Sequence, residues 1–303
     1  MKVAIIGVGL IGGSIAIDLR KAKLASEITG VDANEENALR ALALGLVDIV
    51  KPLDEAVRTA DVVISAIPVS AIQKVLTTAL DNAADHTVVI DAGSTKSQIC
   101  KSVSDHPRRA QFVAAHPIAG TENSGPDAAF SGLFLNKTNI ICEREKSSDR
   151  ALEVATRIFK ALGMRTIYMD PVEHDKHVAY VSHLSHVSAF LLGQTVLDIE
   201  KDEKNIFNLA GSGFASTVRL AKSSPDMWAP IFEQNAEYLS QALLEYIMHL
   251  QKFQYYLMKR DITKLHQIMT DANHIRTVLD GIELKQKKET ELLLDTEVSG
   301  VTQ

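Results

Sequence analysis

Apolar and polar residues alternate along the first 170 residues in a pattern that predicts strands and helices in turn. Short runs rich in Val, Ile and Ala are separated by longer stretches with helical periodicity. We expect strands at residues 3–6, 28–31, 62–66, 87–91, 112–115, 139–142 and 166–168, and helices at 12–23, 35–44, 69–83 and 149–162. This alternation is typical of an α/β fold with a doubly wound, largely parallel sheet and helices on both faces.

The pattern changes after residue 170, where strand signals end and long helical periodicities begin. We expect helices at 177–197, 206–222, 228–259 and 262–286, and a polar tail at 295–303. The change predicts two domains, residues 1–170 with the sheet and residues 171–303 all helical. The stretch 228–257 is rich in Leu, Ile, Phe and Tyr, so we expect part of it to pack against a second subunit and form a homodimer. Packing within one chain is the alternative.

A glycine-rich turn joins the first predicted strand to the first helix. Gly7, Gly9 and Gly12 have the G-x-G-x-x-G spacing of a Rossmann-type dinucleotide site. In such a site the first glycine permits the tight turn, the second lets phosphate approach, and the third allows close packing of helix on sheet. The backbone amides at the helix start, at Leu10 and Ile11, then face the pyrophosphate. A glycine-rich turn in another α/β protein is the alternative.

The predicted cofactor is NAD rather than NADP. Asp32 ends the second predicted strand, twenty residues after Gly12, where an acid binds the ribose 2′-hydroxyl. It would repel the 2′-phosphate of NADP, and the residues after it include no Arg to neutralise that charge. Ile67 and Pro68 follow the next strand at the same edge of the sheet, so we expect them beside the cofactor.

Composition and charge exclude several classes of partner. The 303 residues carry a net charge of −6, which argues against a sequence-independent nucleic-acid binder with a basic face. The two cysteines, Cys100 and Cys142, lack metal-ligand spacing and favour a reducing compartment; we expect both to be buried. Glycines interrupt the apolar N-terminal run, and no cleavage pattern follows it. We therefore expect a cytoplasmic protein without a membrane segment.

Polar side chains follow two more of the predicted strands. Ser94 lies in the segment AGSTK after strand 87–91, and His116 opens the segment HPIAGTE after strand 112–115. Ligands bind outside the carboxyl ends of strands in open α/β sheets, so we expect both residues near the nicotinamide. His116 is then a candidate general base. A structural His before a proline is the alternative.

Four histidines lie within one stretch of thirteen residues, 174–186, around the start of the first predicted helix of the second domain. Two pairs spaced by three can share helix faces, but the zinc pattern of His at i and i+4 with an intervening Glu is missing, so we expect no metal. We expect His183 and His186 to donate hydrogen bonds into the cleft. His174 and His177 are expected in solvent at the start of the helix.

Arg219 is the candidate for binding a substrate carboxylate. It lies on the predicted helix 206–222 between apolar neighbours, after a turn with Gly211 and Gly213 that would let a ligand approach. Arg stays charged and binds carboxylates with two parallel hydrogen bonds. A surface charge is the alternative.

Together these segments resemble the prephenate dehydrogenases of tyrosine biosynthesis. The matching parts are GVGLIGGS at 7–14, DAGSTK at 91–96, HPIAGTE at 116–122, SHLSH at 182–186, and Arg219 with the segment PDMW that ends at Trp228. The resemblance implies NAD-dependent oxidative decarboxylation of prephenate to 4-hydroxyphenylpyruvate, with CO2 and NADH as the other products.

The resemblance also implies roles for single residues. His116 would take the proton of the ring hydroxyl, Ser94 would assist at that hydroxyl, and Arg219 would hold a substrate carboxylate. The remaining substrate-side positions are His183, His186, Thr121, Glu122 and Trp228.

Two departures limit the resemblance. Ala215 stands where some relatives carry a basic residue. The chain also ends too early for the regulatory domain that other relatives append, and no chorismate mutase segment precedes it, so we expect any tyrosine inhibition at the active site.

Three other functions remain open. Arogenate dehydrogenase is one, because Glu122 could meet the ammonium of arogenate. A β-hydroxyacid dehydrogenase is disfavoured because a catalytic Lys is missing from the expected helical setting. A non-catalytic NAD-binding regulator would have no need of His116, Ser94 and Arg219 together.

Overall fold

The computed structural model describes residues 1–203 and 205–282. The chain divides into two compact units, Met1–Leu239 and Ser240–Gln303. The predicted tail at 295–303 and the end of the predicted helix 262–286 lie outside the described residues.

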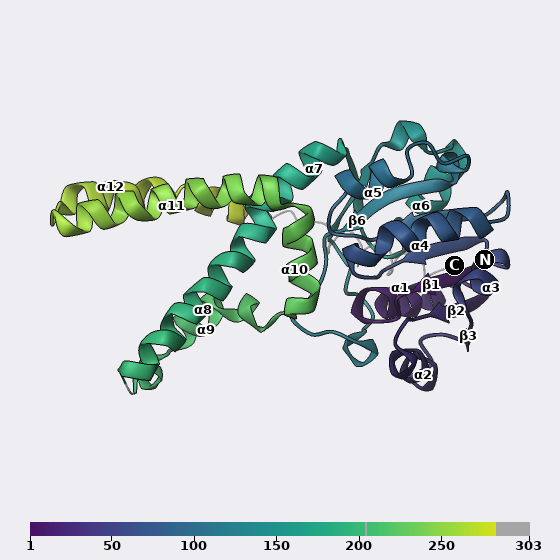
Figure 1. Ribbon diagram of the computed structural model, residues 1–303, viewed down its shortest axis with the longest axis horizontal. Helices are drawn as coiled ribbons and strands as arrows, with labels where there is room; N and C mark the ends of the chain where they lie inside the picture. The colour runs from purple at the N-terminus through teal and green to yellow at the C-terminus, as the bar shows by residue number, and fades with distance from the viewer. Residues whose placement is uncertain (204, 283–303) are drawn as a thin grey trace, which may run out of the picture. The chain divides into compact units, whose positions relative to one another are not determined.

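The first unit contains an eight-stranded sheet (Figure 1). Its strands follow the spatial order β3-β2-β1-β4-β5-β6-β7-β8, and every neighbouring pair is parallel except β6 and β7. The strands are β1 Lys2–Ile6, β2 Glu27–Val31, β3 Ile49–Val50, β4 Val62–Ser65, β5 Val88–Asp91, β6 Phe112–Pro117, β7 Thr138–Cys142 and β8 Arg165–Met169. Strand order reverses between β1 and β4, which is where open α/β sheets bind ligands.

Helices cover both faces of the sheet, as the alternating pattern predicts. They are α1 Leu10–Lys21, α2 Glu35–Ala43, α3 Leu53–Arg58, α4 Val69–Asn82, α5 Ser97–Ser102 and α6 Asp149–Ala161. Along β6, Val113 and Ala115 belong to the buried cluster that includes α1 and α6, whereas Phe112 and Ala114 belong to the cluster under α3, α4 and α5. A strand buried on both faces has to be apolar at every position, which explains the continuous runs in the sequence.

Side-chain caps fix where two of these helices begin. The Asn34 side chain accepts hydrogen bonds from the N–H groups of Glu36 and Asn37, and the Ser148 side chain accepts one from Ala151. Each cap satisfies amides that the first helical turn leaves unpaired. The predicted starts of α2 and α6 are confirmed to the residue. β3 was not predicted, because two residues are too short to show a period.

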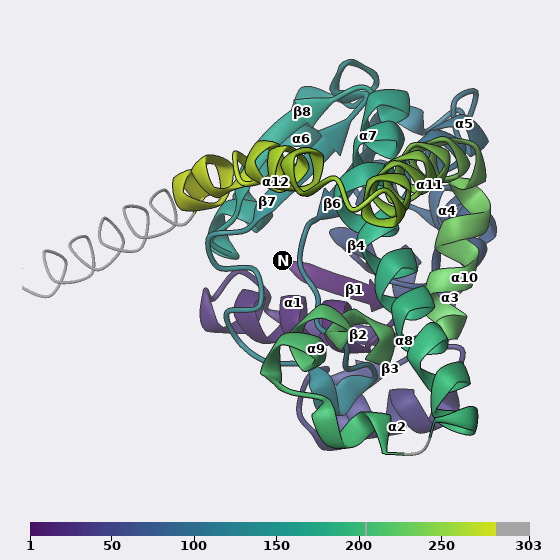
Figure 2. The same ribbon diagram turned by 90° about the vertical axis from the view of Figure 1, so that its left-hand side faces the viewer.

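The helices after the sheet are α7 Pro171–Val178, α8 Leu184–Asp202, α9 Ser212–Thr217, α10 Pro225–Gln234, α11 Ala236–Met258 and α12 Ile262–Ala272 (Figures 1 and 2). A π-helical turn, Ala179–His183, links α7 to α8. Among the described residues no helix is both long and apolar enough to cross a bilayer.

Three predicted helices of this region are wrong as single helices. The helix predicted at 262–286 ends at Ala272, where Asn273 caps α12. The segment 206–222 forms the short helix α9 between two 3-10 turns, Ile206–Leu209 and Arg219–Lys222, because its Gly and Ser residues favour turns over a continuous helix. The segment 228–259 is divided at Asn235, where α10 ends and α11 follows.

Candidate functional site

The turn after β1 has the geometry of a dinucleotide site. Gly7 has a φ of +88°, and a Cβ at this position would lie 2.5 Å from the Ala66 carbonyl oxygen. A Cβ on Gly12 would lie 1.9 Å from the Gly7 carbonyl oxygen. At Gly9, by contrast, a Cβ would make ordinary van der Waals contact, with the Gly125 backbone 3.8 Å away. Helix α1 begins at Leu10 without a side-chain cap, so the first-turn amides of Leu10 and Ile11 suit an anion.

Asp32 borders this turn from the end of β2. Its carboxylate accepts hydrogen bonds from the N–H groups of Val8 (3.1 Å) and Asn34 (2.9 Å), which fixes it beside the turn. Ile67 and Pro68 lie between β4 and α4, on the other side of the point where strand order reverses. The glycines, the uncapped helix and the carboxylate together fit a dinucleotide with a free ribose hydroxyl.

The loop between β6 and β7 is tied to α1, the helix that follows the dinucleotide turn, and to α2. The Ser14 hydroxyl accepts a hydrogen bond from the N–H of Phe130 (3.1 Å), and the Asp18 carboxylate accepts one from the Ser131 hydroxyl (2.7 Å). Arg40 makes a bidentate ion pair with Asp127 in the same loop. Sequence analysis missed this loop, although a nearly buried Asp in the first helix is a signal for such an anchor.

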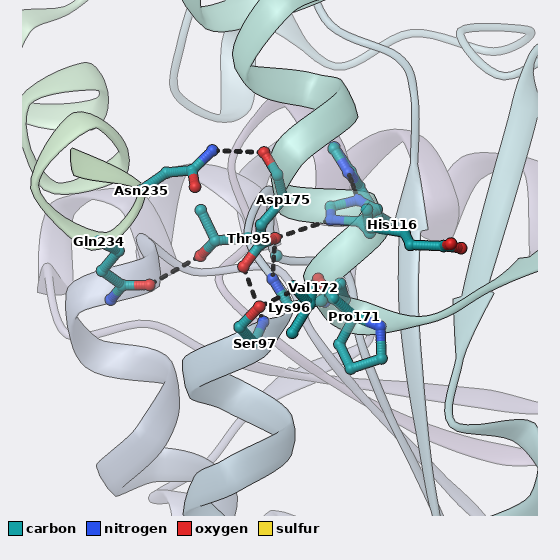
Figure 3. A network of polar contacts seen from close by, with 12 residues as sticks. Thr95, Lys96, Ser97, His116, Pro171, Val172, Asp175, Gln234 and Asn235 are labelled. Atoms are coloured by element: carbon teal, nitrogen blue, oxygen red, sulfur yellow. Dashed lines mark hydrogen bonds and ion pairs between the residues drawn. The ribbon is translucent and has the colours of Figure 1, made fainter. Parts of the chain in front are cut away.

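At the carboxyl end of β6, His116 is the first residue of a chain of hydrogen bonds (Figure 3). Its Nδ1 lies 2.8 Å from Nε2 of His174, and Nδ1 of His174 lies 2.8 Å from Oδ1 of Asp175. The Asp175 carboxylate also accepts hydrogen bonds from the backbone N–H groups of Lys96 (2.7 Å) and Ser97 (2.8 Å). Helix α7, which carries His174 and Asp175, is thereby joined to the start of α5.

The expectation that His174 is exposed to solvent is wrong. Its side chain is completely buried, because α7 packs against α5 and turns that side inward. His177, one turn later, is exposed as expected. The adjacent His and Asp in the sequence were the one available signal for this pair.

A buried ion pair fixes the backbone beside His116. The Lys96 ammonium contacts the Asp91 carboxylate and donates a hydrogen bond to the Ala115 carbonyl (2.7 Å). Asp91 in turn accepts hydrogen bonds from the N–H groups of Gly93 (3.0 Å) and Ala115 (3.1 Å). Burial raises the pKa of Asp91, and the Lys96 cation opposes that rise. The ends of β5 and β6 are therefore locked together. Ser94 lies partly buried in the same turn, between β5 and α5.

The histidines of the site are neutral at physiological pH. Burial, followed by the neighbouring His174 and the Lys96 cation, holds the pKa of His116 well below its ordinary value of 6.5. Burial also lowers the pKa of His174, and it lowers the pKa of His183 to about 4. A neutral imidazole keeps one nitrogen free to accept a proton.

His183 and His186 lie on the π-helical turn and the first turn of α8. The Asn235 side-chain amide donates hydrogen bonds to the Asp175 carbonyl (2.7 Å) and to Nδ1 of His183 (3.1 Å). The ring of His186 stacks on Trp228, with centroids 3.6 Å apart and planes at 26°. Trp228 is nearly buried, and its Nε1 has no hydrogen-bond partner among the described residues. Sequence analysis missed Asn235, which it placed inside one long helix.

Arg219 forms an ion pair with Glu122 across 97 positions of sequence, with Nη1 and Oε2 3.1 Å apart. Glu122 comes from the loop after β6, where the adjacent Thr121 hydroxyl accepts a hydrogen bond from the N–H of Asn123 (3.2 Å). Arg219 starts a 3-10 turn rather than lying inside a helix, because α9 ends at Thr217. Ala215 lies within α9. The Arg219 cation also contributes to lowering the pKa of His186, after the larger effect of burial.

The sequence-predicted residues therefore fall into three groups. The glycines and Asp32 surround the turn after β1, and His116 and His183 belong to one hydrogen-bonded network through His174, Asp175 and Asn235. The third group is the pair of Arg219 and Glu122. In the described part of the chain no three His, Cys, Asp or Glu residues are arranged to hold a metal ion.

Two domains of one protein family match consecutive parts of the chain. Residues 15–168 match the nucleotide-binding domain of prephenate dehydrogenase, and residues 170–271 match the prephenate dehydrogenase dimerization domain. Prephenate dehydrogenase of Bacillus subtilis is 32% identical over 284 residues, which cover 93% of this chain and 76% of that protein.

Solved structures agree with the sequence comparisons. Prephenate dehydrogenase from A. aeolicus, in complex with hydroxyphenyl propionate and NAD+, has a TM-score of 0.85 and 29% identity, covering 92% of this chain and 98% of that one. Synechocystis arogenate dehydrogenase has a TM-score of 0.73 and 26% identity, covering 92% and 100%. The two domain matches follow one another along the chain, and one relative is more than 30% identical over 93% of it. The chain therefore belongs to the prephenate dehydrogenase family of NAD-binding oxidoreductases.

Proposed function

We propose that this enzyme oxidises and decarboxylates prephenate to 4-hydroxyphenylpyruvate with NAD. The observation that carries the proposal is the position of His116. A neutral imidazole with a lowered pKa lies at the carboxyl end of β6, at the same edge of the sheet as the turn that fits a dinucleotide. A base that stays neutral at physiological pH can accept a proton from a hydroxyl group there.

The cofactor supplies the hydride acceptor when it is bound. The N–H groups of Leu10 and Ile11 bind its pyrophosphate next to Gly7, Gly9 and Gly12. Asp32 binds the ribose hydroxyl groups, and its negative charge excludes the 2′-phosphate of NADP. Ile67 and Pro68 form the adjoining wall.

His116 accepts the proton of the substrate's ring hydroxyl as the hydride leaves the same carbon, and Ser94 holds that hydroxyl in place. The ring carboxylate then leaves as CO2, and the electron pair of the broken C–C bond completes the aromatic ring. The ring oxygen, left as a phenolate, takes the proton back from His116, which gives 4-hydroxyphenylpyruvate and restores the neutral base. General-base assistance of this kind is worth about 10²–10⁴-fold in rate.

The substrate is a dianion, so its pocket requires a fixed cation and hydrogen-bond donors. Arg219 supplies the cation, and Nε2–H of His183 supplies a donor. Nδ1 of the neutral His186 donates to the Ser182 carbonyl (3.0 Å), so its Nε2 offers the substrate an acceptor rather than the expected donor. The Trp228 ring, stacked on His186, offers an apolar wall for the substrate ring. Thr121 and Glu122 border the pocket from the loop after β6. A substrate carboxylate that binds Arg219 takes the place of the Glu122 carboxylate in the ion pair.

Arogenate is the second candidate substrate, and one observation favours it. A carboxylate at Arg219 would free Glu122, which could then pair with the ammonium that arogenate carries and prephenate lacks. The two candidates differ in the partner of Glu122 and share the chemistry at His116.

The deciding experiment is an assay of NADH or NADPH formation at 340 nm with each of the two substrates and each of the two cofactors. We expect the highest kcat/KM with prephenate and NAD. Faster turnover of arogenate would instead assign arogenate dehydrogenase activity, and a preference for NADP would contradict the role of Asp32. NAD binding without turnover of either substrate would leave a non-catalytic regulator.

We also propose a homodimer held by the helical region. The second unit exposes apolar side chains along α11, among them Leu244, Ile247 and Met248, at the i, i+3 and i+4 spacing of one helix face. Size-exclusion chromatography with light scattering should give twice the chain mass. Leu244→Lys with Met248→Lys should yield monomers, whereas His249→Lys, at an exposed position about 140° around α11 from Leu244, should not.

We also propose a domain boundary and a location in the cell. We place the boundary between residues 170 and 171, because the Asp170 side chain caps the start of α7. The unpaired, buried Cys100 and Cys142 support a reducing compartment, the cytoplasm.

A further inference from the structure

We propose that His174 and Asp175 are positioning residues that hold His116 in one tautomer, with its proton on Nδ1 and a free lone pair on Nε2. The proposal rests on the proposed role of His116 as proton acceptor. It starts from the chain of hydrogen bonds that runs from His116 through His174 to the Asp175 carboxylate (Figure 3).

The carboxylate of Asp175 is ionised. It receives hydrogen bonds from the backbone N–H groups of Lys96 and Ser97 as well as from the His174 ring. Burial alone would raise the pKa of Asp175, but the hydrogen bonds from His174 and Ser97 outweigh burial and lower it. An ionised carboxylate can only accept hydrogen bonds, so Nδ1 of His174 has to be the donor in their contact.

The next step fixes the second nitrogen of His174. Its ring is completely buried, and burial lowers its pKa below the ordinary value of 6.5, so it carries a single proton. That proton is on Nδ1, and Nε2 is therefore an acceptor. The group 2.8 Å from this Nε2 is Nδ1 of His116, which has to donate. His116 is neutral as well, and its Nε2 is left without a proton.

This tautomer is the one that a base at His116 requires. An imidazole in water divides its proton between both nitrogens, and a ring with the proton on Nε2 offers the substrate a donor instead of an acceptor. After His116 takes the substrate proton, its Nδ1–H still donates to His174, and the Asp175 charge lies one ring away from the new cation. Burial, His174 and the Lys96 cation act against that cation, which keeps His116 neutral beforehand.

Asn235 holds His183 in the opposite tautomer. Its amide donates to the Nδ1 of His183, so the proton of that neutral ring is on Nε2. The same Asn235 amide bonds to the Asp175 carbonyl. One network thus prepares an acceptor at His116 and a donor at His183.

The first test is ¹⁵N NMR of the full chain with labelled histidine, with and without NAD. The signals of His116 are assigned as those that disappear in His116→Asn. We expect Nδ1 of His116 protonated and Nε2 unprotonated between pH 7 and 8. A protonated Nε2 in the wild-type enzyme overturns the proposal. This spectrum needs no turnover, so it separates failure of the tautomer proposal from failure of the proposed activity.

The second test is His174→Phe, with His177→Phe as the matched control on the exposed side of the same helix. Phe has no acceptor for Nδ1–H of His116, so in His174→Phe we expect the His116 proton to move to Nε2, and kcat to fall by about 10²-fold because the base is in the wrong form. The KM for NAD should stay unchanged, and His177→Phe should behave as wild type. An unshifted tautomer with kcat within twofold of wild type overturns the proposal. Should His174→Phe not fold, the wild-type spectrum decides alone.

Discussion

His116 shows how its surroundings set the chemistry of one side chain. The strand places the residue at the edge of the sheet, and the Lys96–Asp91 ion pair fixes the backbone just before it. Burial and the nearby His174 then keep its pKa below 6.5. The base is therefore available at physiological pH and is lost only in more acidic solution.

Replacing His116 by Asn should lower kcat by roughly 10²–10⁴-fold and leave the KM for substrate within a few-fold of wild type, because a base acts mainly in the transition state. Asn can still donate a hydrogen bond to Nε2 of His174, so the network should survive. Steady-state kinetics at saturating NAD measure both constants. Unchanged turnover would remove His116 from the mechanism.

Replacing Arg219 by Ala should raise the KM for substrate. A charge-assisted hydrogen bond is worth roughly 1.5–3 kcal/mol, but the Arg219 side chain is 53% exposed and solvent weakens its contacts. We therefore expect an increase of about tenfold, the lower end of that range. Glu122→Gln is the control, since it breaks the same ion pair and keeps the cation. If the two variants had equal effects on KM, Arg219 would matter only as the partner of Glu122.

The sequence alone identified the candidate base and the dinucleotide turn, because both depend on a strand and the few residues after it. It could not identify the partners of the base. His174 lies 58 positions after His116, and nothing local shows that α7 packs with that residue inward. Asp91 and Lys96 were visible only as part of a motif, and their pairing requires the fold of the whole turn.

At the level of elements, the π-helical turn between α7 and α8 sets which residues face the site. On a regular α-helix, Asp175 and His183 would point about 80° apart, since each residue turns the helix by about 100°. A π turn winds less per residue and brings the two closer to one face. The Asn235 amide then reaches both the Asp175 carbonyl and the His183 ring.

Inserting one alanine after Val181, which is 77% exposed within this turn, should abolish catalysis while NAD binding is kept. The added residue rotates all following residues by about 100° relative to α7. His183 and His186 would then leave Asn235 and Trp228. The measurements are kcat with saturating substrate and the Kd for NAD. Val181→Ala, which keeps the residue count, should remain active; equal activity in the insertion variant would show that the orientation set by this turn has no such role.

Elements with a strong local signal were predicted well, and those shaped by tertiary contacts were not. The capped helices α2 and α6 begin at the predicted residues. The predicted helix 206–222 is broken, because its glycines and serines provide no continuous apolar face to pack against other elements. Asn235, at the break between α10 and α11, donates a side-chain hydrogen bond to a carbonyl 60 positions earlier, a contact that no sequence period contains.

On the scale of the whole molecule, the dinucleotide turn and the histidine network both lie in the first compact unit. The alternating pattern and the glycines were enough to predict a doubly wound sheet followed by helices. The antiparallel pairing of β6 with β7 could not be predicted, because each strand alone has the same apolar pattern in either direction.

Stability should fall as the pH drops from about 6.5 to about 4. His116, His174, His183 and His186 all have lowered pKa values, and that of His183 is about 4. In this window the unfolded chain binds protons that the folded chain does not, so the free energy of unfolding decreases with falling pH. Above pH 6.5 the contribution of these histidines to that free energy is complete. His183 alone accounts for on the order of 3 kcal/mol of this decrease in the free energy of unfolding.

Urea unfolding at pH 8, 6.5 and 5 measures this loss. His177→Gln, at an exposed position, should keep the same dependence on pH, whereas His183→Gln should flatten it. A stability that stays constant over this range in the wild-type enzyme would contradict the low pKa values of the cluster.

The stacking of His186 on Trp228 gives the enzyme an optical reporter of its own. Trp228 is the single tryptophan of the chain, so all indole emission comes from this one ring. A protonated imidazole quenches indole emission more strongly than a neutral one, and burial lowers the pKa of His186 below 6.5. Emission should therefore dim only in acid. At neutral pH, a change in brightness on adding substrate reports the arrival of a ring or a carboxylate beside the stacked pair, without label or turnover.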